Sequence, residues 1–272
     1  MSQVMHRLYG KPVNFAGNHL LRRGTVSYIV KPLVLGTLEA DKSSFTYMAF
    51  PGTPIKLEVA VFLIKGAPRN ILVDTGSWAS LMAKYWPGKG EDFQTLAEAL
   101  GKEGLKFDDI DIIVQTHLHH DHCGYTSQFK NADIYIQEEE WIFAKAPHPL
   151  QAQYYPPELL KGWKKRLIKG DHDLFPGITI LHTPGHTPGT QSMVVETAKG
   201  RAVIPGFCCT YDTFEEPAKV LPPGHPFSHW EVFAPSIATD LNQAYNSCLR
   251  VKSLADVMLP SHGPGFQDMA EI

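Results

Sequence analysis

The chain has 272 residues, 43% of them hydrophobic, and a formal net charge of -3. This is enough apolar sequence for a full core, and because no Ser/Gly-rich linker divides it, we expect one domain over residues 1–272. Acidic and basic residues are interspersed, which excludes the charge pattern of a protein that binds nucleic acid or an anionic membrane. No apolar run reaches the length of a transmembrane span and the first residues lack a signal-peptide core, so a soluble, cytoplasmic protein is expected.

The cysteines also point to a reducing compartment. There are four, Cys123, Cys208, Cys209 and Cys248, too few and too irregularly spaced for a disulfide framework in a chain of this length. Cys248 lies in a helical pattern and is explained by packing. The adjacent pair Cys208 and Cys209 is not explained so simply.

The first half of the chain alternates predicted strands with helices. Residues 55–64 begin as strict alternation and end apolar on both faces, which predicts a strand that starts at a sheet edge and finishes buried. Residues 71–73 are its hairpin partner. The strands predicted in this half cover residues 28–38, 55–64, 71–73, 110–114 and 132–137, and the helices cover residues 91–100 and 138–144.

In the second half, strands are predicted over residues 178–182, 201–206 and 255–260, and a helix over residues 241–249. Two long stretches have no clear periodicity: residues 146–161 are rich in Pro, Gln and Tyr, and residues 213–235 contain several prolines. Loops of this length are often lids or substrate walls, so we expect both to wall a site. His148, in the first of them, is expected to be solvated.

The most informative stretch has the pattern H-x-H-x-D-H directly after a predicted strand. Its four metal-ligand side chains are His117, His119, Asp121 and His122. An extended chain sends alternate side chains to one face, so the first two can converge on one ion. If the backbone then turns into a helix, the last two can reach a second ion. This favours a two-metal site over a solvated loop, and imidazole and carboxylate suit zinc best, with iron or manganese also compatible.

Three further candidates follow predicted strands. Asp74 precedes Thr-Gly, which is ordinary turn chemistry and also the place for a carboxylate that holds a ligand histidine in its tautomer. His186 lies between two Pro-Gly pairs that fix a sharp backbone path, and His262 follows the last predicted strand. Strands alternate with helices, the chain has two strand-rich halves, and the ligand candidates follow strand ends, so we expect two stacked sheets with helices outside. Sites in such α/β layers lie beyond the carboxyl ends of strands.

These motifs, in this order, resemble the metallo-β-lactamase superfamily. They are L-V-D-T-G at residues 72–76, the H-x-H-x-D-H pattern, H-T-P-G-H-T-P-G at residues 182–189 and P-S-H-G at residues 260–263. The resemblance covers roughly residues 30–265 and implies an α/β fold, an αββα sandwich of two mixed β-sheets flanked by helices. It also implies one such domain with an N-terminal extension over about residues 1–27. Within the superfamily, residues 128–137 and 186–192 are most similar to N-acyl-homoserine lactonases and related lactone hydrolases.

The resemblance implies two metal ions. The first would be held by His117, His119 and His186, and the second by Asp121, His122 and His262. Asp74 would orient a ligand histidine without touching the metal.

One motif departs from the family pattern. Family members usually carry an Asp that bridges both metals, and that position here holds Phe207, which cannot ligate. If the register shifts by one, Cys208 becomes the bridge, because a thiolate is a good zinc ligand, and Tyr211 falls near the substrate carbonyl. Cys209 and Asp212 are alternative substitutes. A further alternative is that both cysteines merely pack and the second metal is weaker or missing.

The resemblance implies a dinuclear zinc hydrolase that opens a small lactone, or a related cyclic amide, by attack of a metal-bound hydroxide. Asp121 would pass the proton to the leaving group, and Tyr211 would stabilise the oxyanion. One alternative is a mononuclear iron oxidoreductase of the persulfide-dioxygenase type, which uses a similar H-x-H-x-D-H scaffold. Another is a non-catalytic ligand-binding or redox-sensing module that uses Cys208 and Cys209. The retained ligands of the second metal favour the hydrolase.

A small-molecule substrate is expected, with no nucleic-acid or membrane partner, but the sequence does not identify it. Several aromatic side chains lie in segments that could wall an apolar pocket, although each is individually better explained by packing. They are Tyr28, Phe45, Tyr47, Phe50, Tyr154, Tyr155, Phe207, Phe227 and Trp230. The oligomeric state is open, with a homodimer as the first candidate because dimers are the commonest homo-oligomers.

Overall fold

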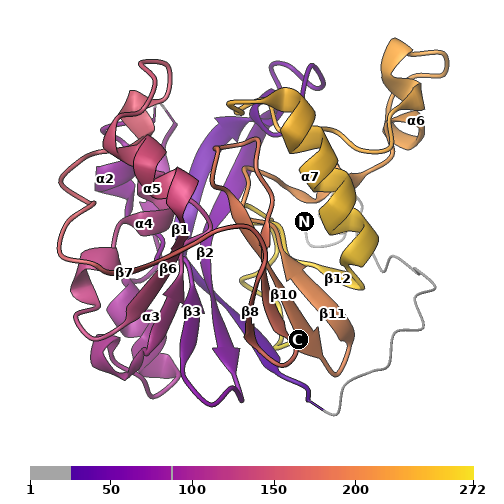
Figure 1. The fold of residues 1–272 in the computed structure, drawn as a ribbon. Coiled ribbons are helices and arrows are strands. Elements are labelled where there is room, and N and C mark those ends of the chain that lie inside the picture. Colours follow the sequence, from indigo (N-terminus) through magenta and orange to yellow (C-terminus); the bar gives the residue numbers. More distant parts are fainter. Residues whose placement is uncertain (1–25, 87) are drawn as a thin grey trace.

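Two β-sheets packed face to face form the centre of the molecule in a computed structural model that describes residues 26–86 and 88–272 (Figure 1). The larger sheet has the strand order β4-β1-β2-β3-β5-β6-β7. Its strands are β1 (Ile29–Asp41), β2 (Pro54–Lys65), β3 (Ile71–Val73), β4 (Gly90–Asp92), β5 (Ile112–Val114), β6 (Asp133–Gln137) and β7 (Lys164–Ile168). Strands β4, β1, β2 and β3 pair antiparallel, and β3, β5, β6 and β7 pair parallel, so the sheet is mixed.

The smaller sheet has the order β12-β11-β10-β9-β8. Its strands are β8 (His172–Phe175), β9 (Ile178–His182), β10 (Gln191–Thr197), β11 (Gly200–Ile204) and β12 (Val257–Met258). Only the pair β11 and β12 is parallel, so this sheet is mixed as well.

Helices cover the outer face of each sheet. The helices are α2 (Ala79–Met82), α3 (Leu96–Lys102), α4 (His120–Cys123), α5 (Glu138–Lys145), α6 (Pro217–Val220) and α7 (Leu241–Leu254). Figure 1 shows α3 and α5 on the side of the larger sheet and α7 across the smaller one. The predicted αββα sandwich is therefore confirmed.

Three apolar cores separate the four layers. The core between the sheets joins side chains of the larger sheet, such as Val73 and Val114, to side chains of the smaller sheet, such as Ile180 and Ile204. A second core lies between the larger sheet and its helices, and a third lies under α7. These cores bury alternate faces of the same strands, as expected for strands that are apolar on both sides.

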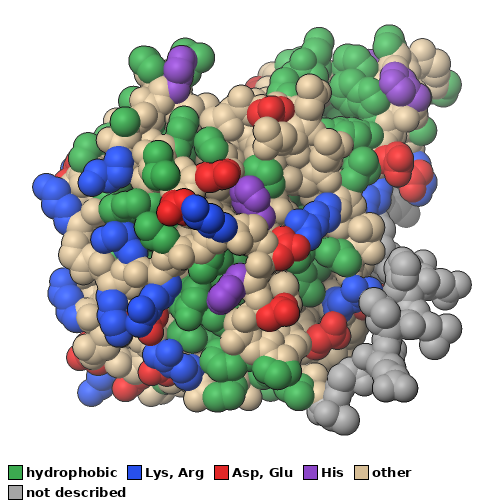
Figure 2. Space-filling model, in the orientation of Figure 1, with side chains coloured by type: hydrophobic (Ala, Val, Ile, Leu, Met, Phe, Trp, Pro, Cys, Tyr) green, Lys and Arg blue, Asp and Glu red, His purple; other side chains and the backbone are tan. Residues whose placement is uncertain are grey.

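The strand at the edge of the larger sheet, β7, carries basic side chains that are largely exposed. Lys164 and Arg166 form ion pairs with Asp133 at 3.0 and 3.1 Å. Figure 2 shows blue side chains gathered over this side of the molecule with red ones among them. Lysine on an edge strand discourages pairing with another chain, so this patch has a structural explanation.

The predicted helix over residues 91–100 was wrong at its start. Residues Gly90–Asp92 form strand β4 at the edge beside β1, and α3 begins only at Leu96. A capping box sets this boundary, because Thr95 Oγ1 accepts from Glu98 N at 3.2 Å and Glu98 Oε2 accepts from Thr95 N at 2.7 Å. Strands β7 and β8 were not predicted.

The predicted N-terminal extension, about residues 1–27, lies outside the described residues except for its last two. Within residues 26–86 and 88–272, no helix combines the length and the apolar character needed to cross a membrane.

Candidate metal centre

Six side chains that can bind metal gather in two clusters at one end of the sheets. The first cluster is His117, His119 and His186, and the second cluster is Asp121, His122 and His262. Within each cluster the candidate ligand atoms lie within 4.8 Å of one another. The five histidines are buried, and the aspartate is partly exposed. The structure therefore brings together all six of the histidine and aspartate ligands that the sequence suggested.

The ligands come from both sheets. Residues 117–122 follow β5 of the larger sheet. His186 lies in the loop between β9 and β10, and His262 follows β12. Each cluster therefore combines two side chains from the larger sheet with one histidine from the smaller sheet.

A change of backbone conformation at His119 separates the two clusters. His119 is the N-cap of α4, with φ -66° and ψ 150°, so the chain is extended up to this residue and helical after it. Alternate residues of the extended part share a face, which places His117 beside His119. The following turn of helix carries Asp121 and His122 to the second cluster.

Asp74 orients one histidine of each cluster. Its Oδ2 accepts hydrogen bonds from His122 Nδ1 at 2.7 Å and from Thr116 Oγ1 at 2.8 Å, and its Oδ1 accepts from Thr116 N at 2.7 Å. Because the Thr116 hydroxyl donates to Asp74, it accepts from His117 Nδ1, 3.1 Å away. In their neutral forms, His117 and His122 therefore carry the proton on Nδ1 and present an unprotonated Nε2 to the clusters.

The third histidine of the first cluster is fixed in the same way. His186 Nδ1 donates to the carbonyl oxygen of Ile237 at 2.5 Å, and its Nε2 lies 3.2 Å from His117 Nε2. Two unprotonated nitrogens at this distance repel each other. Two nitrogen ligands of one tetrahedral zinc, with Zn–N distances of about 2.0–2.1 Å, lie about 3.3 Å apart.

The second cluster has comparable spacing. His122 Nε2 lies 3.3 Å from His262 Nε2, and Asp121 Oδ2 lies 3.6 Å from each of these nitrogens. Ligand atoms that converge at such distances are the feature that a bound cation would satisfy, so the residues present fit one metal ion in each cluster.

The protonation states also suit metal binding. Burial lowers the pKa values of His117 and His119 well below their ordinary value, and lowers those of His186 and His262 to about 4. These four side chains are neutral imidazoles at pH 7, which is the form that binds metal.

In the second cluster, the charges of neighbouring side chains shift the pKa values of Asp121 and His122. Burial alone would raise the pKa of Asp121, but the neighbouring histidines hold it far below its ordinary value, so this side chain is a carboxylate. Burial alone would lower the pKa of His122, but the carboxylates of Asp121 and Asp74 raise it above its ordinary value.

Of the residues in the segment 207–212, one lines the pocket beside the clusters. Cys208 is part of the pocket lining, although it belongs to neither cluster. Phe207 and Cys209 are buried in the core under α7. Asp212 points away and forms an ion pair with Lys42 at 2.8 Å. Cys209 and Asp212 are therefore not placed to replace the missing bridging aspartate.

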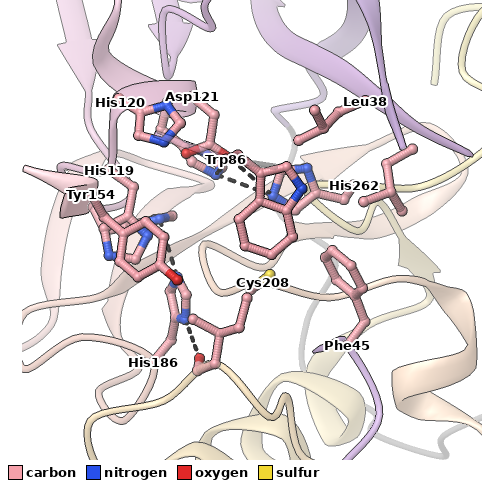
Figure 3. Close-up of a pocket in the computed structure, with 14 residues that line it drawn as sticks. Leu38, Phe45, Trp86, His119, His120, Asp121, Tyr154, His186, Cys208 and His262 are labelled. Carbon is pink, nitrogen blue, oxygen red and sulfur yellow. Dashed lines mark hydrogen bonds and ion pairs between the residues drawn. The ribbon is translucent and has the colours of Figure 1, made fainter. Parts of the chain in front are cut away.

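The rest of the pocket lining is mostly apolar and aromatic (Figure 3). Besides the six cluster residues and Cys208, it consists of Leu38, Phe45, Leu57, Trp86, His120, Tyr154 and Ile237. No lysine or arginine is among these described side chains. Two of the aromatic residues considered from the sequence, Phe45 and Tyr154, are in this set.

Of the two loops predicted to wall the site, only one contributes to the pocket lining, and the predicted catalytic tyrosine, Tyr211, does not. Residues 146–161 contribute Tyr154 to the lining, whereas no described residue of 213–235 is part of it. Tyr211 also lies outside the lining, with its ring 6.5 Å from that of Phe266. His148 is exposed, as expected.

Trp86, His120 and Ile237 were not considered from the sequence. Only His120 could have been suspected from the sequence, because it lies inside the H-x-H-x-D-H pattern. The other two come from loops whose side-chain directions depend on the whole fold.

A four-layer sandwich with two clusters of His and Asp side chains at the ends of its sheets is the architecture of a class of metal-dependent enzymes. The sequence matches the metallo-beta-lactamase superfamily over residues 55–241, and the chain belongs to that superfamily. It is 31% identical to an N-acyl homoserine lactonase of Bacillus cereus over 194 residues, which cover 66% of this chain and 76% of the relative.

Two solved structures are similar over nearly their whole length. One is the F107W mutant of AiiA from B. thuringiensis with N-decanoyl-L-homoserine at its active site, with 26% identity, a TM-score of 0.70 and coverage of 90% of this chain and 96% of that one. The other is an N-acyl homoserine lactone hydrolase with the product N-hexanoyl-L-homoserine at its catalytic metal centre, with 26% identity, a TM-score of 0.69 and the same coverage. The predicted membership of the lactonase-like branch is confirmed, and this chain is a metal-dependent hydrolase of the lactonase type.

Proposed function

We propose that this protein is a dinuclear zinc lactonase that hydrolyses a small cyclic ester, with a related cyclic amide as the nearest alternative substrate. The observation that supports this proposal best is the spacing of the candidate ligand nitrogens within two adjacent buried clusters. The product-bound relative with a catalytic metal centre gives independent support for ring opening at such a site.

The donor set favours zinc. Each cluster offers imidazole nitrogens, and the second adds a carboxylate, which are donors that zinc accepts readily. When bound, the metal ions would supply an activated water nucleophile at neutral pH and polarise the substrate carbonyl.

We propose Asp121 as the group that carries the proton. Its Oδ2 faces the two histidines of its cluster, which leaves Oδ1 to accept a proton from the attacking water and deliver it to the leaving alkoxide. Its low pKa keeps this side chain ionised at pH 7.

We propose Tyr154, rather than Tyr211, as the hydroxyl that donates to the substrate carbonyl, because Tyr154 is in the pocket lining and Tyr211 is not. Figure 3 shows the Tyr154 hydroxyl directed into the pocket. A donor aimed at the developing oxyanion stabilises the transition state.

We further propose that the Cys208 sulfur takes the place of the family's bridging carboxylate. Its support is the position of Cys208 in the lining, which no other residue of 207–212 shares. Burial raises the pKa of this thiol well above its usual value, so a nearby cation is required to hold it as a thiolate.

The apolar lining without lysine or arginine supports a neutral substrate with an apolar substituent. Apart from the proposed metal ions, the described lining offers no basic side chain to pair with a carboxylate or a phosphate on the substituent of the substrate, and such a charge would lose its hydration without compensation.

The test combines metal analysis with turnover on a panel of lactones and cyclic amides. We expect two zinc ions per chain in the wild type and lactone hydrolysis that is lost in His119→Ala. His148→Ala is the matched control, since His148 is an exposed histidine outside both clusters and its loss should leave turnover unchanged. Full hydrolysis by His119→Ala would contradict the proposal. One iron per chain with oxygen consumption would identify the persulfide-dioxygenase alternative instead.

A further inference from the structure

A buried glutamate outside both metal clusters contacts the loops that carry the first one. Glu140 lies in the first turn of α5, and its side chain has no exposed surface. Burying a carboxylate costs several kcal/mol unless hydrogen bonds satisfy it. The structure supplies four such bonds, and their origin indicates what this residue does.

The four donors come mainly from the two ligand loops. Glu140 Oε1 accepts from Leu118 N at 2.9 Å and from Tyr155 Oη at 3.1 Å. Glu140 Oε2 accepts from Thr187 Oγ1 at 2.5 Å and from Gly189 N at 3.2 Å. Leu118 lies between the first two ligand histidines, and Thr187 follows the third. One carboxylate therefore joins the two loops that together form the first cluster.

The loop that carries His186 can approach α5 this closely only because position 189 is a glycine. A Cβ atom at Gly189 would lie 2.3 Å from the backbone nitrogen of Glu140 and 2.4 Å from its Cβ. Any other residue at position 189 would push the loop away from α5. Because this loop also carries His186, its separation from α5 fixes where that ligand stands relative to the other two.

Tyr155 extends the same contact to a ligand. Its hydroxyl donates to Glu140, and its ring lies against the His119 imidazole with 4.9 Å between centroids. Glu140 therefore acts on the first cluster through the backbone beside His117 and His119, through the loop of His186, and through the Tyr155 ring.

We infer that Glu140 is the positioning residue of the first metal site: it holds His117, His119 and His186 in binding geometry without touching the metal or the substrate. The inference rests on the metal binding in the proposed function. It predicts that loss of the carboxylate weakens one of the two metals selectively. A residue that merely stabilised the fold would lower the melting temperature without changing the ratio of the two affinities.

The test is Glu140→Gln, which keeps the size of the side chain and replaces one acceptor oxygen with a donor that faces other donors. Zinc dissociation constants are measured by competition with a chelator in two backgrounds. In His262→Ala the first site remains intact, and in His119→Ala the second site remains intact. We expect Glu140→Gln to raise the dissociation constant roughly 10- to 100-fold in the His262→Ala background and to leave it unchanged in the His119→Ala background.

Glu58→Gln is the matched control. Glu58 is also a buried carboxylate that accepts a backbone hydrogen bond, from Phe266 N at 2.7 Å, but it lies outside the contacts of the first cluster. It should leave the first-site constant unchanged. If Glu58→Gln and Glu140→Gln weaken that site equally, the inference is overturned.

Two other outcomes are informative. If Glu140→Gln folds and its first-site dissociation constant is unchanged, the inference is overturned. The proposed function still stands in that case, provided that the wild type binds two zinc ions. If the wild type binds no zinc, both the inference and the proposed function are contradicted. If Glu140→Gln does not fold, Tyr155→Phe removes one of the four donors and keeps the charge. It should weaken the first site severalfold and selectively, and an unchanged constant would overturn the inference.

Discussion

The substitution Asp74→Asn tests how the two clusters are organised. Three hydrogen bonds converge on this carboxylate, from Thr116 N, Thr116 Oγ1 and His122 Nδ1. Asp74 has a positive φ of 59°, a conformation that Asn tolerates and Ala does not favour. Asn therefore removes the charge and one acceptor without adding backbone strain.

The magnitude follows from the geometry. If the Asn oxygen faces His122 and the Thr116 hydroxyl, its amide group opposes Thr116 N, so one hydrogen bond is lost and two lose their charge assistance. A buried donor without a partner costs about 1–3 kcal/mol. This agrees with the roughly 10- to 100-fold loss in metal affinity, about 1.4–2.8 kcal/mol, that such outer contacts typically produce.

The structure predicts that Asp74→Asn weakens both metals, unlike Glu140→Gln. His122 of the second cluster contacts Asp74 directly, and His117 of the first cluster is connected to it through the Thr116 hydroxyl. Thr116→Val removes only the second connection, so it should weaken the first metal alone.

The assay is chelator competition for zinc, with circular dichroism to confirm that each variant is folded. Wild-type affinity at both sites in Asp74→Asn would refute the assigned hydrogen-bond chain. A larger effect of Thr116→Val on the second site than on the first would also refute it.

Three further predictions follow from the site. Cys208→Ser should lower zinc content or affinity while Cys209→Ser should not, and equal metal content in both variants would remove Cys208 as a ligand. Tyr154→Phe should lower kcat/KM for lactones by about tenfold or more while Tyr211→Phe has little effect, which steady-state kinetics can check. The metal-free protein should lose stability on acidification. His186 and His262 have pKa values of about 4 in the folded protein, whereas a histidine in an unfolded chain has a pKa of about 6.5. Between these two values the unfolded state therefore binds more protons than the folded state, and acidification favours unfolding. The loss between pH 7 and pH 5 is about 2 kcal/mol per histidine, and urea unfolding curves that coincide at pH 7 and pH 5 would contradict it.

The fold was largely predictable because its strands carry strong local patterns. The predicted strand over residues 55–64 corresponds to β2, Pro54–Lys65, and ligand residues follow strands that were evident as apolar runs. In contrast, β7 has the sequence KKRLI and is mostly exposed at a sheet edge, so no alternation reveals it. Strand β4 forms through pairing with β1, which local sequence does not encode.

The clustering of the six histidine and aspartate side chains was predictable because their spacing is set by one strand and one helical turn, or by the end of a strand. The other parts of the site depend on tertiary contacts. Glu140 ends a run of three glutamates that reads as a solvated helix start, and its partners Thr187 and Gly189 lie more than forty residues away. The choice between Tyr154 and Tyr211 likewise depends on loop paths that no local pattern determines.

Because each cluster takes ligands from both sheets, the spacing of the sheets sets the spacing of the ligands. That spacing is determined by the thickness of the core between them, for example where Val73 and Ala202 are fully buried. A larger side chain in this core would separate the sheets and spread the ligands, since protein interiors have little free space. The apolar side chains between the sheets thus help to set the geometry of the candidate metal centre, and a change of their size is expected to alter metal affinity as well as stability.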